Sequence, residues 1–172
     1  MKTMHIGMVA ALAAVVAVLA VACGGDDGVT VEEFVKKVYE LDVKHEMVAD
    51  PLRTELNAAL ADRAPEDKLP GGLKVTLAKL FDEEDRFASQ IGALDPSGAG
   101  KDIQKETVAA LRAEAKYGRE LVDSLGENTT VGDIDSAFES AEAVQVDTRR
   151  SNACMSLQKL ADDNGIDVDM TC

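Results

Sequence analysis

The sequence contains no tryptophan, two tyrosines and four phenylalanines, so a hydrophobic core must be built mainly from alanine, valine and leucine. Basic residues are also scarce. Only 18 Lys and Arg stand against 32 Asp and Glu, which gives a formal net charge of −14. Lys and Arg supply the affinity for nucleic-acid phosphates and for anionic lipid surfaces. The composition therefore argues against a nucleic-acid partner and against adsorption to an anionic membrane surface.

The usual catalytic signatures are missing as well. The chain has no phosphate-binding P-loop, no Gly-x-Gly-x-x-Gly after a strand, and no Gly-x-Ser-x-Gly nucleophile elbow. His45-Glu46 could begin a zinc-protease motif, but Ala49 stands where the second histidine would have to be. No Cys-x-x-Cys-His sequence is present for covalent haem. We therefore predict that the protein is not an enzyme and carries no cofactor.

What the sequence does have is a distinctive start. Lys2 and His5 precede an apolar run from Ile6 to Ala22 that contains no charged residue. The run is short for a membrane span, which needs about 20 apolar residues. It ends in small residues, as a signal-peptidase cleavage site requires. The pattern predicts that residues 1–22 are a signal peptide.

The end of this run, Ala20-Val21-Ala22-Cys23, resembles the lipobox of bacterial lipoproteins. In that family the signal is cut just before the cysteine, which then receives a diacylglyceryl group and usually a further acyl chain. The chain departs from the family at Ala20, where leucine is commonest. The resemblance implies that Cys23 is lipidated. Two or three acyl chains hold a protein stably at a membrane.

The resemblance also implies a domain organisation and a location. We expect residues 23–29, rich in Gly and Asp, to be a lipidated flexible tether and residues 30–172 to form one domain. The domain would lie on the extracytoplasmic face of the cell membrane, periplasmic or at the cell surface. Its expected partner is the membrane, through the anchor, with another envelope protein as a candidate partner.

Helical periodicity runs through the rest of the chain. Apolar residues recur at three- and four-residue spacing, which is typical of amphipathic helices, and no segment alternates like a strand. Thr30-Val31-Glu32-Glu33 is a capping box that places the first helix start at Thr30. Pro51 should kink or break that helix. The expected helices span residues 30 to about 63, 73–94, 102–125 and 130–164, joined by loops rich in Pro and Gly.

These elements predict an all-α fold, an up-down-up-down four-helix bundle. After Gly165 the last residues form a tail that ends at Cys172. Cys154 and Cys172 are the two cysteines not assigned to lipid, and in an oxidising compartment they should form a disulfide. The bridge would tie the tail to the last predicted helix. This terminal segment resembles the C-terminal ends of uncharacterised small helical lipoproteins of high-GC bacteria, a resemblance that implies no activity.

Polar residues interrupt the apolar stripes near mid-helix. Glu84, Glu114 and Gln145 are placed at similar heights, and His45 lies somewhat higher unless a break at Pro51 lowers it. The pattern resembles faintly the carboxylate metal sites of ferritin-like bundles, which use paired Glu-x-x-His sequences. The pairs present, Asp42-x-x-His45 and Glu142-x-x-Gln145, depart from that sequence. We therefore expect no metal, with His45, Glu84 and Glu114 as the candidate ligands if one binds.

The preferred interpretation places Glu84, Glu114 and Gln145 at the rim of the stripes, in contact with water, and His45 at a helix interface. The expected function is that of a membrane-anchored extracytoplasmic lipoprotein, a non-catalytic binding or structural module of the cell envelope. The alternative is a helical bundle that binds a small ligand or a metal.

Overall fold

The computed structural model describes residues 28–170, so the predicted signal peptide, Cys23 and Cys172 lie outside the described residues. The described chain is helical and contains no strand, only two isolated β-bridges. This confirms the predicted all-α class. The helices are α1 (Val31–Leu60), α2 (Leu73–Gly92), α3 (Gly100–Ser124), α4 (Val131–Phe138) and α5 (Ala141–Asp163).

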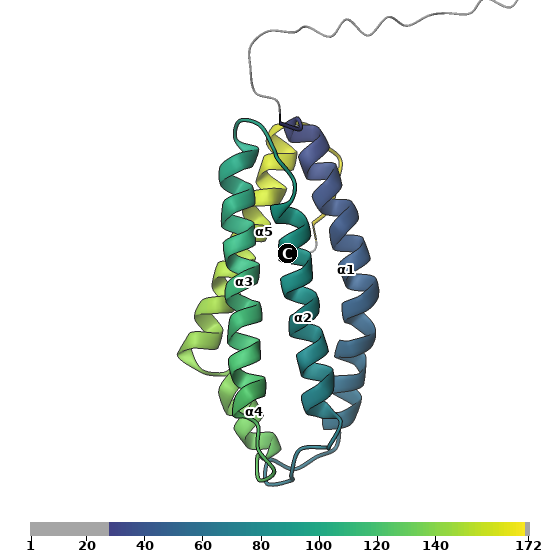
Figure 1. The fold of residues 1–172 in the computed structure, drawn as a ribbon, viewed down its shortest axis with the longest axis vertical. Helices are drawn as coiled ribbons and strands as arrows, with labels where there is room; N and C mark the ends of the chain where they lie inside the picture. The colour runs from purple at the N-terminus through teal and green to yellow at the C-terminus, as the bar shows by residue number, and fades with distance from the viewer. Residues whose placement is uncertain (1–27, 171–172) are drawn as a thin grey trace, which may run out of the picture.

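Four long helices lie side by side and alternate in direction along the chain (Figure 1). α2 packs against both α1 and α3, and α5 packs against α3 and, less extensively, α1. The short α4 sits at one end of the molecule, beside the loop that joins α1 to α2 (Figure 1). Among the helices of residues 28–170, none is long and apolar enough to cross a membrane.

The first helix begins where the capping box predicts. The Thr30 hydroxyl accepts from the Glu33 N–H, and the Glu33 carboxylate accepts from the Thr30 N–H. The helix then continues through Pro51 to Leu60 without interruption. The break considered at Pro51 is therefore absent.

The helix expected over residues 130–164 is wrong as a single element. It divides at Glu139-Ser140, where Ser140 adopts an extended conformation with ψ of 153°. The Ser140 hydroxyl accepts from the Ala143 N–H and so caps a new helix. The hydroxyl of Tyr117 in α3 donates to the carbonyl of Ala137, which fixes the end of α4 against the bundle.

The core divides into two hydrophobic clusters. One surrounds Phe34, Phe87 and Leu157 and includes the tail residues Ile166 and Met170. The other surrounds Leu77, Phe81 and Ile134 near the α4 end. The buried residues His45 and Glu84 come between these clusters along α1 and α2.

A small residue on α3 lets α2 approach closely. Gly118 is buried, and a Cβ placed on it would lie 2.1 Å from the ring of Phe81 in α2. That distance is far below any real carbon–carbon contact, so the Phe81 ring occupies the space that a side chain would need.

The chain after α5 folds back along it, as expected for the tail. Gly165 adopts a positive φ of 66°, which glycine tolerates and which ends the helix. The Gln158 side chain then holds the tail. Its oxygen accepts from the Met170 N–H, and its amide donates to the Val168 carbonyl.

Candidate functional site

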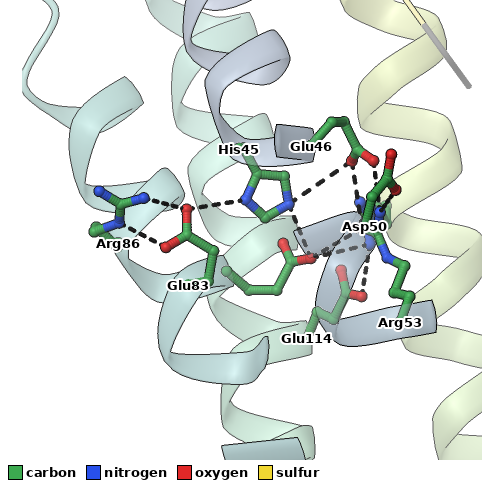
Figure 2. Close-up of polar contacts among 9 residues, drawn as sticks. His45, Glu46, Asp50, Arg53, Glu83, Arg86 and Glu114 are labelled. Atoms are coloured by element: carbon green, nitrogen blue, oxygen red, sulfur yellow. Dashed lines mark hydrogen bonds and ion pairs between the residues drawn. The ribbon is translucent and has the colours of Figure 1, made fainter. Parts of the chain in front are cut away.

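A layer of charged side chains crosses the interior between the two hydrophobic clusters. His45 of α1 is its centre, with 1% of its surface exposed. The imidazole stacks on Phe87 at a centroid distance of 4.6 Å and an interplanar angle of 7°. Figure 2 shows the ring between Glu83 on one side and the Glu46–Arg53 pair on the other.

Both ring nitrogens of His45 face carboxylates. Nε2 lies 3.2 Å from Glu84 Oε1, and Nδ1 lies 3.4 Å from Glu83 Oε1. The contacts lie within ion-pair distance, but neither has the alignment of a hydrogen bond. Glu83 is also held by Arg86, at 2.5 Å. The site is therefore an ionic cluster that joins α1 to α2.

Two arginines extend the cluster, and one of them, Arg150, connects it to α3 and α5. Arg53 contacts Glu46 at 2.5 Å and Asp50 at 3.1 Å, and its Nη2 lies 3.8 Å from Glu84. Arg150 of α5 contacts Glu114 of α3 at 2.7 Å and Glu84 of α2 at 3.5 Å. Glu84, with 2% exposure, thus faces three cations contributed by two helices.

The mutual charges shift the protonation equilibria. Burial lowers the pKa of His45, but Glu84 and Glu83 outweigh that effect and raise it above its ordinary value. Burial would raise the pKa of Glu84, yet His45, Arg150 and Arg53 hold it below the usual range. A charged His45 and an ionised Glu84 therefore stabilise each other.

The pKa of Glu114 is shifted in the opposite direction from that of Glu84. Burial raises the pKa of Glu114, and the charge of Glu84 adds to the increase, although Arg150 opposes it. One carboxylate oxygen of Glu114 and one of Glu84 are buried without a hydrogen-bond partner in the described chain. Of the two acids bridged by Arg150, Glu84 is thus the one that stays ionised more readily.

The structure corrects part of the sequence interpretation. Glu84 is buried rather than at the rim, because cations from α1 and α5 converge on it and offset the cost of desolvating its charge. Glu114 is partly buried, with 21% of its side chain exposed. Gln145 is exposed, as expected, and His45 lies at a helix interface, as expected.

His45, Glu84 and Glu114 are brought into one layer, yet the arrangement does not form a recognisable metal site. Among residues 28–170, no group of three or more His, Cys, Asp or Glu side chains is arranged to hold a metal ion. Arg150 lies 2.7 Å from Glu114 and 3.5 Å from Glu84, so a cation of the protein itself already faces these two carboxylates. The prediction that the protein binds no metal stays a prediction.

Sequence reasoning missed Arg53, Arg150 and Glu83. Arg53 follows Asp50 by three residues and Glu46 by seven, so these three share one face of α1. That spacing was a signal available in the sequence. Arg150 offered no such signal, because its partners Glu84 and Glu114 come from other helices.

A cleft of about 440 Å³ opens between α1 and α5, beside the charged layer. Its wall is mainly apolar where α2 and α3 contribute, with Phe87, Ile91 and Leu111 beside the single polar residue Thr107. Met170 of the tail also lines the cleft. The polar residues of the lining that α1 and α5 contribute, here called the lip, are Asp42, Glu46, Arg53, Asp147, Arg150 and Ser151.

Of the three cysteines singled out in the sequence, one can be placed. Cys154 of α5 is partly buried and lines the cleft near Met170. Cys172, its expected disulfide partner, lies two residues beyond the last described position, and the predicted lipidation site Cys23 lies before the first.

Comparison with known proteins adds no family to this picture. The chain matches no protein-family model, and neither a curated protein nor a solved structure resembles it closely enough to be a relative.

Proposed function

We propose that this protein is a lipid-anchored, extracytoplasmic binding protein that holds a small amphipathic molecule in the cleft between α1 and α5. The cleft is the observation that carries the proposal. Its volume of about 440 Å³ falls in the range of roughly 300–1,000 Å³ that small-molecule sites occupy. An apolar wall beneath a charged lip suits a ligand with an apolar body and a polar head.

The described structure also supports a binding role over a catalytic one. His45 is the side chain best suited to general acid–base chemistry, but it is buried and does not line the cleft. Glu84 and Glu114 are likewise absent from the cleft lining. His45, Glu84 and Glu114 thus hold the helices together, and we propose no reaction for the cleft.

The anchor rests on the sequence alone. Ala20-Val21-Ala22-Cys23 would be processed as in lipoproteins, and residues 24–29 would connect the lipid to α1. Because Cys23→Ala removes the thiol that would carry the lipid, we expect less of this variant than of the wild type to sediment with the membrane after carbonate washing. Unchanged membrane association of Cys23→Ala would refute the lipid anchor.

The finer fold assignment belongs to the same proposal. The alternating direction of α1, α2, α3 and α5 supports an up-down-up-down four-helix bundle. Residues 166–170 fold back along α5, and Met170 lines the same cleft as Cys154, which supports a Cys154–Cys172 disulfide. Such a bridge would keep Met170 against the cleft.

A fluorescent probe tests whether the cleft takes ligands. N-phenyl-1-naphthylamine, which is uncharged at neutral pH, should bind the full chain in neutral-lipid nanodiscs with one saturable site above the empty-disc background. Ala110→Leu with Ala153→Leu should weaken that binding at least tenfold, because both alanines are buried and line the cleft. Ala109→Leu is the matched control, because Ala109 is exposed and does not line the cleft.

Two results would contradict the binding role. One is the absence of saturable probe binding. The other is equal binding by the wild type and the double variant when circular dichroism shows that both are folded. A milder lip variant, Ser151→Phe, provides the same comparison if the double variant does not fold.

A further inference from the structure

The charges at the lip of the cleft are of two kinds, those already paired within the protein and those left without a partner. The arginines are of the first kind. Both terminal nitrogens of Arg53 contact Glu46, and one also contacts Asp50. Arg150 donates to Glu114 and lies near Glu84. A ligand anion would have to compete with these carboxylates for each guanidinium.

Asp42 and Asp147 are of the second kind. They line the cleft from α1 and α5, and neither makes a hydrogen bond or an ion pair within the described chain. Burial raises the pKa of Asp42 above its ordinary value and the charge of Glu46 adds to the increase, while His45 and Arg150 oppose it. Asp42 is partly buried without a direct ion-pair partner in the described chain, a cost that a positively charged ligand would reduce, whereas Asp147 is exposed on the opposite helix.

Below this lip, the cleft offers an apolar surface. Phe87 and Ile91 of α2 and Leu157 of α5 are buried and line it, together with Val38 and Leu111. None of these side chains could replace the water around a small inorganic ion. The occupant therefore needs an apolar body of its own.

The whole molecule favours the same sign of ligand. The formal charge of −14 gives a negative potential around the protein, which raises the local concentration of cations and repels anions. The effect acts before contact and weakens with salt.

From these observations we infer that the ligand is a monovalent organic cation, an ammonium group on an apolar body. The ammonium lies between Asp42 and Asp147, and the body rests against Phe87, Ile91 and Leu157. This inference rests on the proposed binding role of the cleft and adds to it the chemical class of the ligand.

Three water-soluble probes that share a phenyl body test the inference. Benzyltrimethylammonium is the cation, phenylacetate the anion and benzyl alcohol the neutral compound. Each is titrated by calorimetry into the full chain in phosphatidylcholine nanodiscs, with empty discs as reference. Benzyltrimethylammonium should bind at one site, at least tenfold more tightly than phenylacetate, and its affinity should fall as salt is added.

The double variant Asp42→Asn with Asp147→Asn should lower the affinity for benzyltrimethylammonium at least tenfold and leave that for benzyl alcohol unchanged. The control, Glu40→Gln with Asp135→Asn, removes the same charge from two exposed acids outside the cleft and should change the affinity little. Each single variant, Asp42→Asn or Asp147→Asn, gives a partial loss if the double variant does not fold.

The outcomes separate the ligand class from the binding role. Phenylacetate binding as tightly as the cation overturns the ligand class and leaves the binding role intact. Unchanged cation affinity in a folded double variant overturns the placement between Asp42 and Asp147. If none of the three compounds binds and N-phenyl-1-naphthylamine does not bind either, the binding role itself fails.

Discussion

At the scale of single residues, the buried charges depend on one another. Glu84 is the clearest case, because it lies near His45, Arg53 and Arg150 while almost wholly buried. Ion pairs in the interior gain little over apolar packing, but removing one partner leaves the others buried and uncompensated. A single substitution in the layer should therefore cost more stability than the intact layer contributes over apolar packing.

We expect Glu84→Gln to lower the free energy of unfolding by about 3 kcal/mol, because His45 and Arg150 lose their buried counter-charge. Glu40→Gln, at an exposed position of α1, should change it by less than about 0.5 kcal/mol. Urea denaturation measures both. A near-neutral Glu84→Gln would mean that the cluster contributes nothing to the fold.

His45 should make stability depend on pH. Its pKa is raised in the folded state, so the folded protein holds the proton more tightly than the unfolded chain. The stabilisation is complete below the unfolded pKa of about 6.5 and is lost as the pH rises through the folded pKa.

The measurement compares wild type with His45→Gln, because the carboxylates around His45 (Glu46, Glu83 and Glu84) titrate in both proteins. The difference in unfolding free energy between the two should shrink as the pH rises above about 6.5. A difference that stays constant or grows over that range would show that His45 is neutral in the fold.

At the scale of helices, the approach of α2 to α3 depends on the absence of a side chain at Gly118. Gly118→Ala should destabilise the protein by about 2 kcal/mol, because the new methyl group overlaps the Phe81 ring. Gly92→Ala is the matched control, since its Cβ would lie 3.7 Å from Val108, an ordinary contact. Thermal melting that ranks the two variants equally would contradict this packing.

The sequence predicts a helix boundary when the residues that fix that boundary lie close together in the chain. The start at Thr30 is predicted because the capping box lies within four residues. The division at Ser140 is not predicted from the sequence. Ser140 caps α5 by accepting from the N–H of Ala143, and alanine has no side chain that could complete a capping box. The end of α4 is also held by Tyr117, which belongs to another helix, α3.

The candidate site follows the same rule. Sequence spacing places Glu84 and Glu114 near one level of the bundle and His45 somewhat higher. The structure brings all three into one layer, although α1 is unbroken at Pro51. Whether Glu84 is buried depends on Arg150, which comes from another helix, so its exposure could not be read from its own stripe. The cleft likewise depends on how closely α1 and α5 pack.

At the scale of the whole molecule, the proposed tail disulfide would tie the domain together and the proposed lipid anchor would tie it to a membrane. A Cys154–Cys172 bridge closes a short loop and should contribute on the order of 3 kcal/mol. Protein isolated from the envelope should show this bridge by non-reducing mass spectrometry. Finding both cysteines as free thiols in that sample would rule it out.

The central claim is that the cleft between α1 and α5 holds a small organic cation, and photoaffinity labelling in membranes tests it most directly. A benzyltrimethylammonium probe with a diazirine on its ring should label peptides from residues 38–53 and 147–157, and unlabelled benzyltrimethylammonium should compete for both. Labelling confined to exposed apolar positions far from the cleft, such as Val75 or Phe138, and insensitive to the competitor would contradict the account.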